Sequence, residues 1–369
     1  MNVRVAFALK ANYGSDREVA SQCLANDLES GLNYLYIVDS EDAETLVIEN
    51  STKIQIKSFK IDRFLKWIPR GTRYQIWLQY VQLWIFINRK SLKTISFITL
   101  TQLICPIWTQ LFIPTVVGPL GTIGLVKGNH SYKLLLKSFF IWRVLRIIPL
   151  LFLRGRNLTV AVIHPSLICF IPRQTNVRIV SALDPKYLKN HVDIHSEKER
   201  IVVSVGRDVS FKNFGLVRAV FRQLSLKNDN KFKFILINST LGCDVLQHTS
   251  MFQEVGRLPR EEVLSLMSRA SLHLMPSFEL AGFVSLEAAM KKTATFCIKD
   301  MGAHHMLSPS NEFMLSGMSL TSKRLEERIA MLLDDPKLRK AEGNRQYNNA
   351  RLFIEKNEKS LNNLRSHDF

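Results

Sequence analysis

Short apolar runs alternate along this chain with longer segments in which apolar and polar positions are mixed. The first forty residues show the pattern: an apolar run at Asn2–Leu9, a predicted helix over Asp16–Leu28 and a second apolar run at Leu32–Asp39. Apolar runs of this length, separated by helical segments, are typical of buried strands in a parallel sheet covered by helices on both faces. The opening of the chain therefore predicts an α/β fold.

The same alternation begins again after a polar stretch at 184–200. The apolar runs beyond it predict strands at Ile201–Val205, Phe232–Asn238, Ser271–Met275 and Thr295–Lys299. The segments between and after them predict helices at Phe214–Leu224, Arg260–Arg269, Ser285–Met290, Lys323–Leu333 and Lys337–Phe353. Because 369 residues fit two cores better than one, we predict domains at 1–183 and 201–350, a linker at 184–200 and a C-terminal helix or tail at 351–369.

Residues Thr94–Val126 carry no charged side chain and are long enough to suggest a membrane-spanning helix. Prolines and glycines interrupt this segment, so we predict short buried strands instead. The strands predicted for the rest of the first domain are Thr94–Leu100, Thr115–Val117 with a turn at 118–121, Leu158–Ile163 and Val177–Val180.

The net charge of +18 is concentrated in one part of the chain. Residues 1–50 carry 3 basic and 9 acidic side chains, whereas residues 51–181 carry 19 basic side chains and one acidic side chain, Asp62. Two segments of the basic stretch, Phe64–Lys90 and Tyr132–Arg156, also contain many large apolar residues and predict helices that lie in a membrane interface. We expect an anionic membrane surface as a partner and no nucleic acid, with a solvated basic face as the alternative.

The five cysteines are scattered and never form a C-x-x-C pair, so the sequence predicts neither a disulfide framework nor a zinc site. The apolar stretch at the N-terminus is too short for a signal peptide. We expect a cytoplasmic protein that associates peripherally with the inner face of the cell membrane.

Two carboxylates, Glu279 and Glu287, stand eight positions apart where a predicted strand passes through a loop into a helix. Gly282 lets a ligand approach the backbone, and the free N–H groups at the helix start can bind an anionic diphosphate. Glu287, which we place in the first turn of the helix, can accept hydrogen bonds from the hydroxyls of a ribose. The alternative is an exposed loop residue at 279 and a carboxylate at 287 that the helix dipole favours.

A pair of cations follows the strand Ile201–Val205, in the loop at 206–212 that reads GRDVSFK. Arg207 and Lys212 can stabilise the negative charge of a nucleoside diphosphate leaving group without a metal. The alternative is that both are solvated loop cations.

Together these groups resemble the family 4 glycosyltransferases, also called glycosyl transferases group 1, which pair a Gly-Arg…Lys loop with a Glu-x7-Glu segment. In this chain the first is Gly206, Arg207 and Lys212, and the second is Glu279 and Glu287. Further matches follow in order at 255–262, 275–277, 286–290 and 300–303, so the resemblance covers about 201–350. It implies the GT-B fold, in which two Rossmann-like doubly wound domains face a central cleft.

The resemblance also implies a role for each matched residue. Arg207 and Lys212 would bind the donor diphosphate, Glu279 the donor sugar and Glu287 the ribose, so the candidate catalytic residues are Arg207, Lys212 and Glu279. The other donor-binding candidates are Gly206, Arg257, Gly282, Phe283, Val284, Ser285 and Glu287. Members of the family transfer sugars with retention of anomeric configuration and without a metal, so we expect no cofactor.

We therefore predict a retaining, hexosyltransferase-type enzyme that moves a sugar from a nucleotide-sugar donor to a lipid-linked or oligosaccharide acceptor. The loop at 113–121 resembles a subgroup in polysaccharide assembly, which indicates the biosynthesis of lipopolysaccharide or capsule. Departures such as Thr122, in place of a second glycine, leave open a degenerate, non-catalytic scaffold that binds nucleotide or lipid in an assembly complex. His304 and His305, which we place in a loop near the phosphates, are weaker candidates.

Overall fold

The computed structural model describes residues 1–6, 23–24, 27–29, 32–39, 54–59, 70–98, 112–120, 157–164, 168, 171, 173, 175–180, 197–208, 212–227, 232–241, 244–279 and 282–366. The chain divides into two compact units. Unit 1 comprises Met1–Val126, His130–Asp184 and Asn357–Phe369, and unit 2 comprises Lys127–Asn129 and Pro185–Lys356. The interface helix predicted at Tyr132–Arg156 lies outside the described residues.

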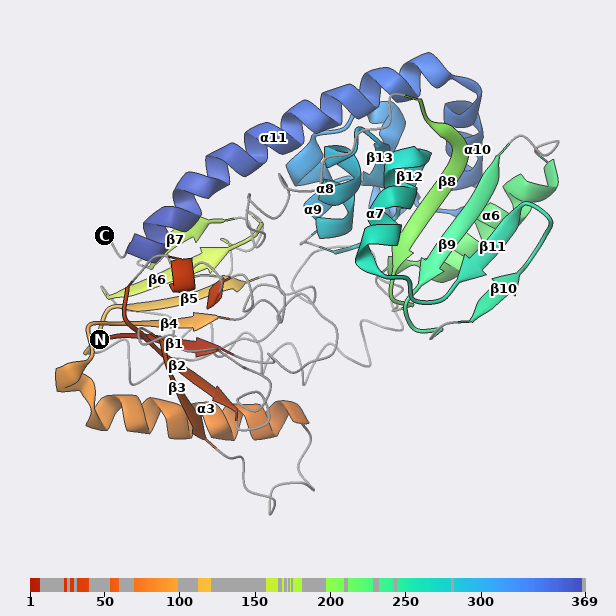
Figure 1. The fold of residues 1–369 in the computed structure, drawn as a ribbon. Helices are drawn as coiled ribbons and strands as arrows, with labels where there is room; N and C mark the ends of the chain where they lie inside the picture. The colour runs from red at the N-terminus through yellow and green to blue at the C-terminus, as the bar shows by residue number, and fades with distance from the viewer. Residues whose placement is uncertain are drawn as a thin grey trace. The chain divides into compact units, whose positions relative to one another are not determined.

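Unit 1 contains a seven-stranded sheet in which every strand pair is parallel, as Figure 1 shows. The strand order is β3-β2-β1-β4-β5-β6-β7. The strands are β1 (Asn2–Ala6), β2 (Tyr34–Asp39), β3 (Ile54–Phe59), β4 (Thr94–Ile98), β5 (Thr115–Leu120), β6 (Leu158–Val162) and β7 (Asn176–Ile179). Buried strands such as β6 explain the continuous apolar runs of the sequence.

Two features of unit 1 differ from the sequence prediction. β3, which reads IQIKSF, was not predicted, because its apolar and polar residues alternate only weakly at the edge of the sheet. The turn predicted at 118–121 is wrong for its first three residues, since β5 continues to Leu120 with an irregular register after Val117. β5 can include Pro119 because such an irregularity interrupts the ladder of backbone hydrogen bonds.

The helix predicted over Phe64–Lys90 is α3 (Arg70–Ile87), followed by the 3-10 turn η2 (Arg89–Ser91). α3 contacts the end of β3, where the indole of Trp77 donates a hydrogen bond of 3.1 Å to the carbonyl of Phe59. Among the helices that the structure describes, none combines the length and apolar character that crossing a bilayer requires.

A buried ion pair lies at the centre of the unit 1 sheet. Arg4 on β1 donates to Asp27 at 3.0 and 3.2 Å and to the hydroxyl of Ser96 on β4 at 2.7 Å. The hydroxyl of Tyr36 on β2 donates to the same carboxylate at 2.6 Å. Burial opposes the charge of Arg4, but the neighbouring Asp27 outweighs it and raises the pKa of the guanidinium.

Unit 2 contains a second seven-stranded sheet, in the order β10-β11-β9-β8-β12-β13-β14. All its strand pairs are parallel except β10 with β11. The strands are β8 (Glu199–Gly206), β9 (Lys233–Asn238), β10 (Val245–Gln247), β11 (Phe252–Val255), β12 (Ala270–Met275), β13 (Ala294–Ile298) and β14 (Met314–Leu315). The helices are α6 (Phe214–Lys227), α7 (Arg260–Arg269), α8 (Phe283–Met290), α9 (Gly302–Leu307), α10 (Ser322–Asp334) and α11 (Pro336–Ser366), with 3-10 turns η7 (Asn311–Phe313) and η8 (Gly317–Ser319). The residues of α11 from Asn357 onward belong to unit 1.

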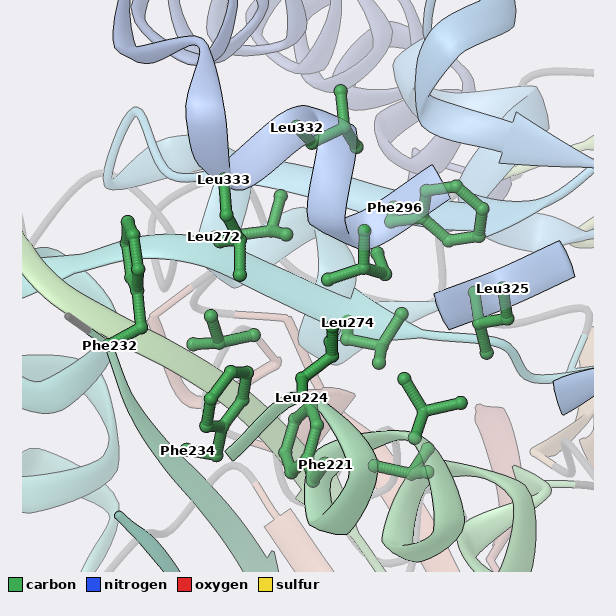
Figure 2. Close-up of a cluster of buried hydrophobic side chains, with 14 of the residues drawn as sticks. Phe221, Leu224, Phe232, Phe234, Leu272, Leu274, Phe296, Leu325, Leu332 and Leu333 are labelled. Carbon is green, nitrogen blue, oxygen red and sulfur yellow. The ribbon is translucent and has the colours of Figure 1, made fainter. Parts of the chain in front are cut away.

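Two apolar clusters hold the helices of unit 2 against its sheet. On one face, α6 and α10 pack on β8, β9, β12 and β13. Figure 2 shows residues of this cluster, among them Phe221 and Leu224 of α6, Phe234 of β9, Leu274 of β12 and Leu325 of α10. A second cluster joins α7 and α8 to alternate residues of β8 and β9. Helices on both faces of a largely parallel sheet confirm the predicted α/β, doubly wound class.

Lys198 fixes the point where the chain enters β8. Its ammonium donates to the carbonyls of Ser268 and Lys291 at 2.6 and 2.8 Å, and to the hydroxyl of Thr293 at 3.0 Å. Those two carbonyls lie at the ends of α7 and α8, where a cation is favourable. Burial, with smaller contributions from Lys291 and Lys292, lowers the pKa of Lys198 to about 8.

Candidate active site

The structure brings Lys212 and Glu279 together at the carboxyl edge of the unit 2 sheet. Lys212 follows β8 and Glu279 follows β12, and these strands are neighbours. The Nζ atom of Lys212 lies 3.1 Å from Oε2 of Glu279, and the two side chains are only 8% and 16% exposed. Two of the three predicted catalytic residues thus meet in a partly desolvated ion pair, where each charge acts more strongly than in water.

Asn213 joins the two loops that carry this pair. Its backbone has a φ of 56°, a left-handed conformation that asparagine tolerates better than most residues. Its side-chain amide donates a hydrogen bond of 2.6 Å to the carbonyl of Pro276, in the loop after β12. The sequence prediction did not include Asn213, although its place directly after Lys212 was the available signal.

Glu279 is held from both sides through its backbone. Its N–H donates to the hydroxyl of Ser277 at 3.1 Å, and its carbonyl accepts a hydrogen bond of 3.0 Å from the N–H of Gly302 at the start of α9. The carboxylate therefore projects toward Lys212 from a fixed backbone, as a preorganised site requires.

Gly206 leaves the space that the Lys212 side chain fills. A Cβ atom at Gly206 would lie 2.9 Å from Cδ and 3.1 Å from Nζ of Lys212. The glycine predicted to belong to the donor site thus has a steric role, because any larger residue would push the ammonium away from Glu279.

The charge of Lys212 also reaches His273, a fully buried residue in the middle of β12. Burial, and to a smaller degree the ammonium of Lys212, lowers the pKa of His273 to about 3. His273 is therefore neutral at ordinary pH. Its Nδ1 atom lies 3.4 Å from the hydroxyl of Thr295 on β13.

Arg207, the third predicted catalytic residue, is exposed beside β8. It makes no ion pair with any residue in the described part of the chain. The next residue, Asp208, is held at 2.5 Å by the guanidinium of Arg218 on α6. Asp208 is thus anchored to α6, whereas its neighbour Arg207 is exposed.

Arg218 belongs to a charge network that the sequence prediction missed. Its guanidinium also donates to the buried carboxylate of Glu254 on β11 at 2.8 and 2.7 Å. Asn238, at the end of β9, donates to the same carboxylate at 2.7 Å, and His248 lies 3.1 Å from it. Burial opposes the charge of Glu254, but hydrogen bonds from Arg218, Asn238 and His248 lower its pKa to about 2. The network ties the ends of β8, β9 and β11 together.

Glu287 lies in the second turn of α8, not in the first turn as predicted, because α8 begins two residues earlier at Phe283. Its carboxylate pairs with the guanidinium of Arg260 at 2.7 Å, from the first residue of α7. Sequence reasoning missed Arg260, since the two residues stand 27 positions apart. The carboxylate of Glu287 is 16% exposed, and a carboxylate that pairs with one guanidinium can still accept hydrogen bonds from hydroxyl groups.

Gly282 allows α8 to start close to α9. Its φ is +55°, and a Cβ atom there would lie 2.8 Å from the backbone nitrogen of Ala303 and 2.5 Å from the Cε atom of Met306. The glycine is thus required by the turn and by the neighbouring helix, in addition to the ligand approach that the sequence suggested.

The other predicted donor-binding residues of α8 differ in exposure. Phe283 and Val284 are half-buried, whereas Ser285 is fully buried. The hydroxyl of Ser285 has no hydrogen-bond partner among the described residues. Arg257 is exposed between β11 and α7, next to the Arg260 end of the site.

His304 and His305 lie within α9, so the loop predicted for them is wrong. Burial is the main cause that lowers the pKa of both imidazoles. His305 packs edge-on against Phe353 of α11, with the ring centroids 5.8 Å apart. Within the described residues, no group of three or more His, Cys, Asp or Glu side chains is placed to hold a metal ion.

Comparison with known proteins supports the assignment of unit 2. Residues 189–349 match the family described as glycosyl transferases group 1. No curated protein sequence matches the chain.

Several solved structures share the fold over nearly the whole chain. Sucrose-phosphate synthase from Thermosynechococcus elongatus has a TM-score of 0.69 at 14% identity. The match covers 100% of this chain and 99% of the synthase chain. HepE from Anabaena, solved with UDP-glucose, has a TM-score of 0.64 at 13% identity and covers 100% of both chains. WaaG, a glycosyltransferase involved in lipopolysaccharide biosynthesis, has a TM-score of 0.62 at 12% identity and covers 99% of both chains. The chain thus has the GT-B fold of these solved structures, and its residues 189–349 match the glycosyl transferases group 1.

Proposed function

We propose that this chain is a glycosyltransferase, which takes a sugar from a nucleotide-sugar donor bound at the carboxyl edge of the unit 2 sheet. The observation that carries the proposal is the Lys212–Glu279 pair, at 3.1 Å, in a domain of a glycosyltransferase family. The carboxyl edge of such a sheet is where doubly wound folds bind their ligands. The solved relative HepE contains UDP-glucose, which is a donor of this class.

Each charged group has a task in the proposed reaction. An ammonium has three N–H donors, so Lys212 can bind Glu279 and still donate to a donor diphosphate. Arg207, exposed on the same loop, supplies a second cation as the glycosidic bond breaks. Glu279 orients the ammonium and accepts hydrogen bonds from the donor sugar, while Glu287 accepts hydrogen bonds from the ribose.

The finer parts of the proposal extend beyond the donor site. We propose a retaining transfer of a hexose without a metal, to a lipid-linked or oligosaccharide acceptor in the biosynthesis of a cell-surface polysaccharide. The involvement of WaaG in lipopolysaccharide biosynthesis and the basic, apolar stretch at 51–181 support this choice. The same stretch supports a cytoplasmic enzyme at the inner face of the membrane.

The test is the release of nucleoside diphosphate from a panel of sugar nucleotides by the purified full-length chain, with and without EDTA. The wild type should release the diphosphate from at least one donor in either condition. Lys212→Ala should lower the rate by about 100-fold or more, because it removes a preorganised cation from the developing negative charge. Lys227→Ala removes an exposed lysine paired with Glu326 and should leave the rate unchanged.

A scaffold gives a different result in the same experiment. It would bind nucleotides, which a thermal-shift measurement detects, yet it would release no diphosphate from any donor. Equal rates for Lys212→Ala and the wild type would remove Lys212 from the mechanism. Loss of release with EDTA would contradict the metal-independent part of the proposal.

A further inference from the structure

One face of α3 exposes large apolar side chains along the described length of the helix. Ile76, Tyr80, Leu83 and Ile87 are between 41% and 67% exposed. Their spacings of four, three and four residues place them in line on one side of a helix that turns about 100° per residue. We call these four residues the outer stripe of α3.

The opposite face of α3 attaches the helix to unit 1. Trp77, Leu78, Val81 and Ile85 are buried there, and Trp77 hydrogen-bonds to the end of β3. The helix is therefore apolar on two sides, although one side is enough to hold it against the sheet. A continuous apolar stripe left in contact with water is typical of a docking surface.

Cations and aromatic rings border the C-terminal end of the outer stripe. Arg89 and Lys90 are exposed directly after α3. The guanidinium of Arg89 lies 4.4 Å from the ring centre of Phe86 and 5.9 Å from that of Phe112, which is itself exposed. Lys57 on β3 lies 4.2 Å from the ring centre of Trp84. Basic side chains beside apolar ones suit the boundary between lipid headgroups and acyl chains.

The charge of the surrounding sequence decides between possible occupants of this face. No Asp or Glu occurs between Asp62 and Asp184. A second copy of the chain would bring the same excess of positive charge to the contact, and like charges would oppose that contact. An anionic lipid surface offers both the negative charge and the apolar phase that the stripe lacks.

We propose that the outer stripe of α3, with Arg89 and Lys90, docks unit 1 on an anionic phospholipid bilayer. The helix lies in the interface, with Leu83 and Ile87 at the acyl boundary and the two cations at the headgroups. The inference deepens the proposed function, because a lipid-linked acceptor is reached at such a surface. It names the part of the basic stretch that makes the contact.

Vesicle flotation of the full-length chain tests this inference. The wild type should float with vesicles made of equal parts phosphatidylcholine and phosphatidylglycerol, and not with vesicles of phosphatidylcholine alone. The double variant Leu83→Gln, Ile87→Gln should lower the bound-to-free ratio by about tenfold or more, because it removes apolar area from the contact. Removing Arg89 and Lys90 with alanine should lower the ratio by about fivefold for each charge.

Matched controls separate the stripe from exposed apolar residues in general. Leu226→Gln on α6 and Leu352→Gln on α11 change side chains that are also exposed, and flotation should not change. Flotation of the stripe variant at the wild-type level would overturn the inference, as would equal binding to uncharged vesicles. A wild-type dimer that the stripe variant converts to a monomer would show that a second copy covers this face instead.

Diphosphate release by the stripe variant, measured without vesicles, distinguishes the two proposals. A variant that loses flotation and keeps the wild-type release rate shows that the helix acts in docking alone. If the wild type floats but releases no diphosphate from any donor, the docking surface stands and the proposed transfer fails.

Discussion

The sheets of the two units differ in what they bury at their centres. In unit 1, the middle of β1 holds Arg4, whose register partners are Tyr36 on β2 and Ser96 on β4. All three are polar, and Asp27 neutralises the guanidinium inside the unit. The guanidinium, the carboxylate and both hydroxyls thus each have a partner within the protein.

In unit 2, the comparable position on β8 is Val203, with Ile235 and His273 as register partners. This row is apolar or neutral, since burial keeps His273 uncharged. The Lys212–Glu279 pair lies instead in loops beyond the strand ends. The difference shows how to separate two kinds of buried charge: a pair enclosed in a sheet supports the fold, whereas a pair at the carboxyl edge keeps donors available for a ligand.

The largest expected loss of stability follows from breaking the buried pair of Arg4 and Asp27. Asp27→Asn leaves the guanidinium of Arg4 buried without a counter-charge and should lower the free energy of unfolding by about 3–5 kcal/mol in urea denaturation. Glu199→Gln breaks an exposed pair with Arg269 and should cost less than about 1 kcal/mol. Similar losses for both variants would remove the distinction between the sheet centre and the surface.

The pair of Lys212 and Glu279 at the carboxyl edge should affect activity more than stability. Glu279→Gln keeps the shape of the side chain and removes its charge, so diphosphate release should fall by about 100-fold. The free energy of unfolding should change by less than about 1 kcal/mol, because Gln can still accept from Lys212. Glu326→Gln, where a carboxylate that is 12% exposed pairs with the exposed Lys227, is the matched control for both measurements. A large stability loss with full activity would make the edge pair structural.

Acid should destabilise unit 2, because His273 at the centre of its sheet stays neutral in the folded state. Between about pH 6.5 and the folded pKa of about 3, His273 takes up a proton in the unfolded chain but not in the folded one. The unfolded state binds more protons in this window, so the free energy of unfolding should fall by about 1.4 kcal/mol for each pH unit of acidification.

His273→Phe should flatten this dependence in urea denaturation measured above pH 4.5. Below that value Glu254 contributes as well, because its folded pKa is about 2 and its ordinary value is 4.5. A variant with the same slope as the wild type would show that other groups carry the acid sensitivity.

The smallest expected effect comes from the glycine beneath Lys212. Gly206→Ala places a Cβ atom against Cδ and Nζ of Lys212 and should lower diphosphate release by about fivefold to tenfold. Gly215→Ala meets no atom within 4 Å and lies in α6, so it should keep the rate and add about 0.5–1 kcal/mol of stability. If both variants keep the wild-type rate, Lys212 does not depend on the space at Gly206.

Local pattern was enough to predict most elements of unit 2. The helix predicted at Arg260–Arg269 has the observed bounds, and β12 begins one residue before the predicted strand Ser271–Met275. These segments have clear periodicity and buried apolar faces. The sequence prediction missed β10, β11 and α9. Of these, β10 is fully exposed and α9 has only six residues, so neither gives a clear apolar pattern.

A residue of the candidate site was predictable only where it stood in a loop or motif that the sequence itself shows. Lys212 and Glu279 were predicted and meet as an ion pair. Arg260 and Arg218 were not, because their partners lie 27 and 36 positions away and only the folded chain brings them together. Spacing along a sequence identifies which chemical groups are present, but the tertiary fold decides which of them face each other.

The contacts of Lys198 have a consequence for anyone who wishes to excise unit 2 as a separate protein. A fragment that starts at the predicted boundary of 201 would lose this ammonium, and with it the cation at the ends of α7 and α8. A fragment that stops at 350 would likewise lose Ile354, which is buried in α11. A separate unit 2 therefore needs a start before Lys198 and an end beyond Ile354.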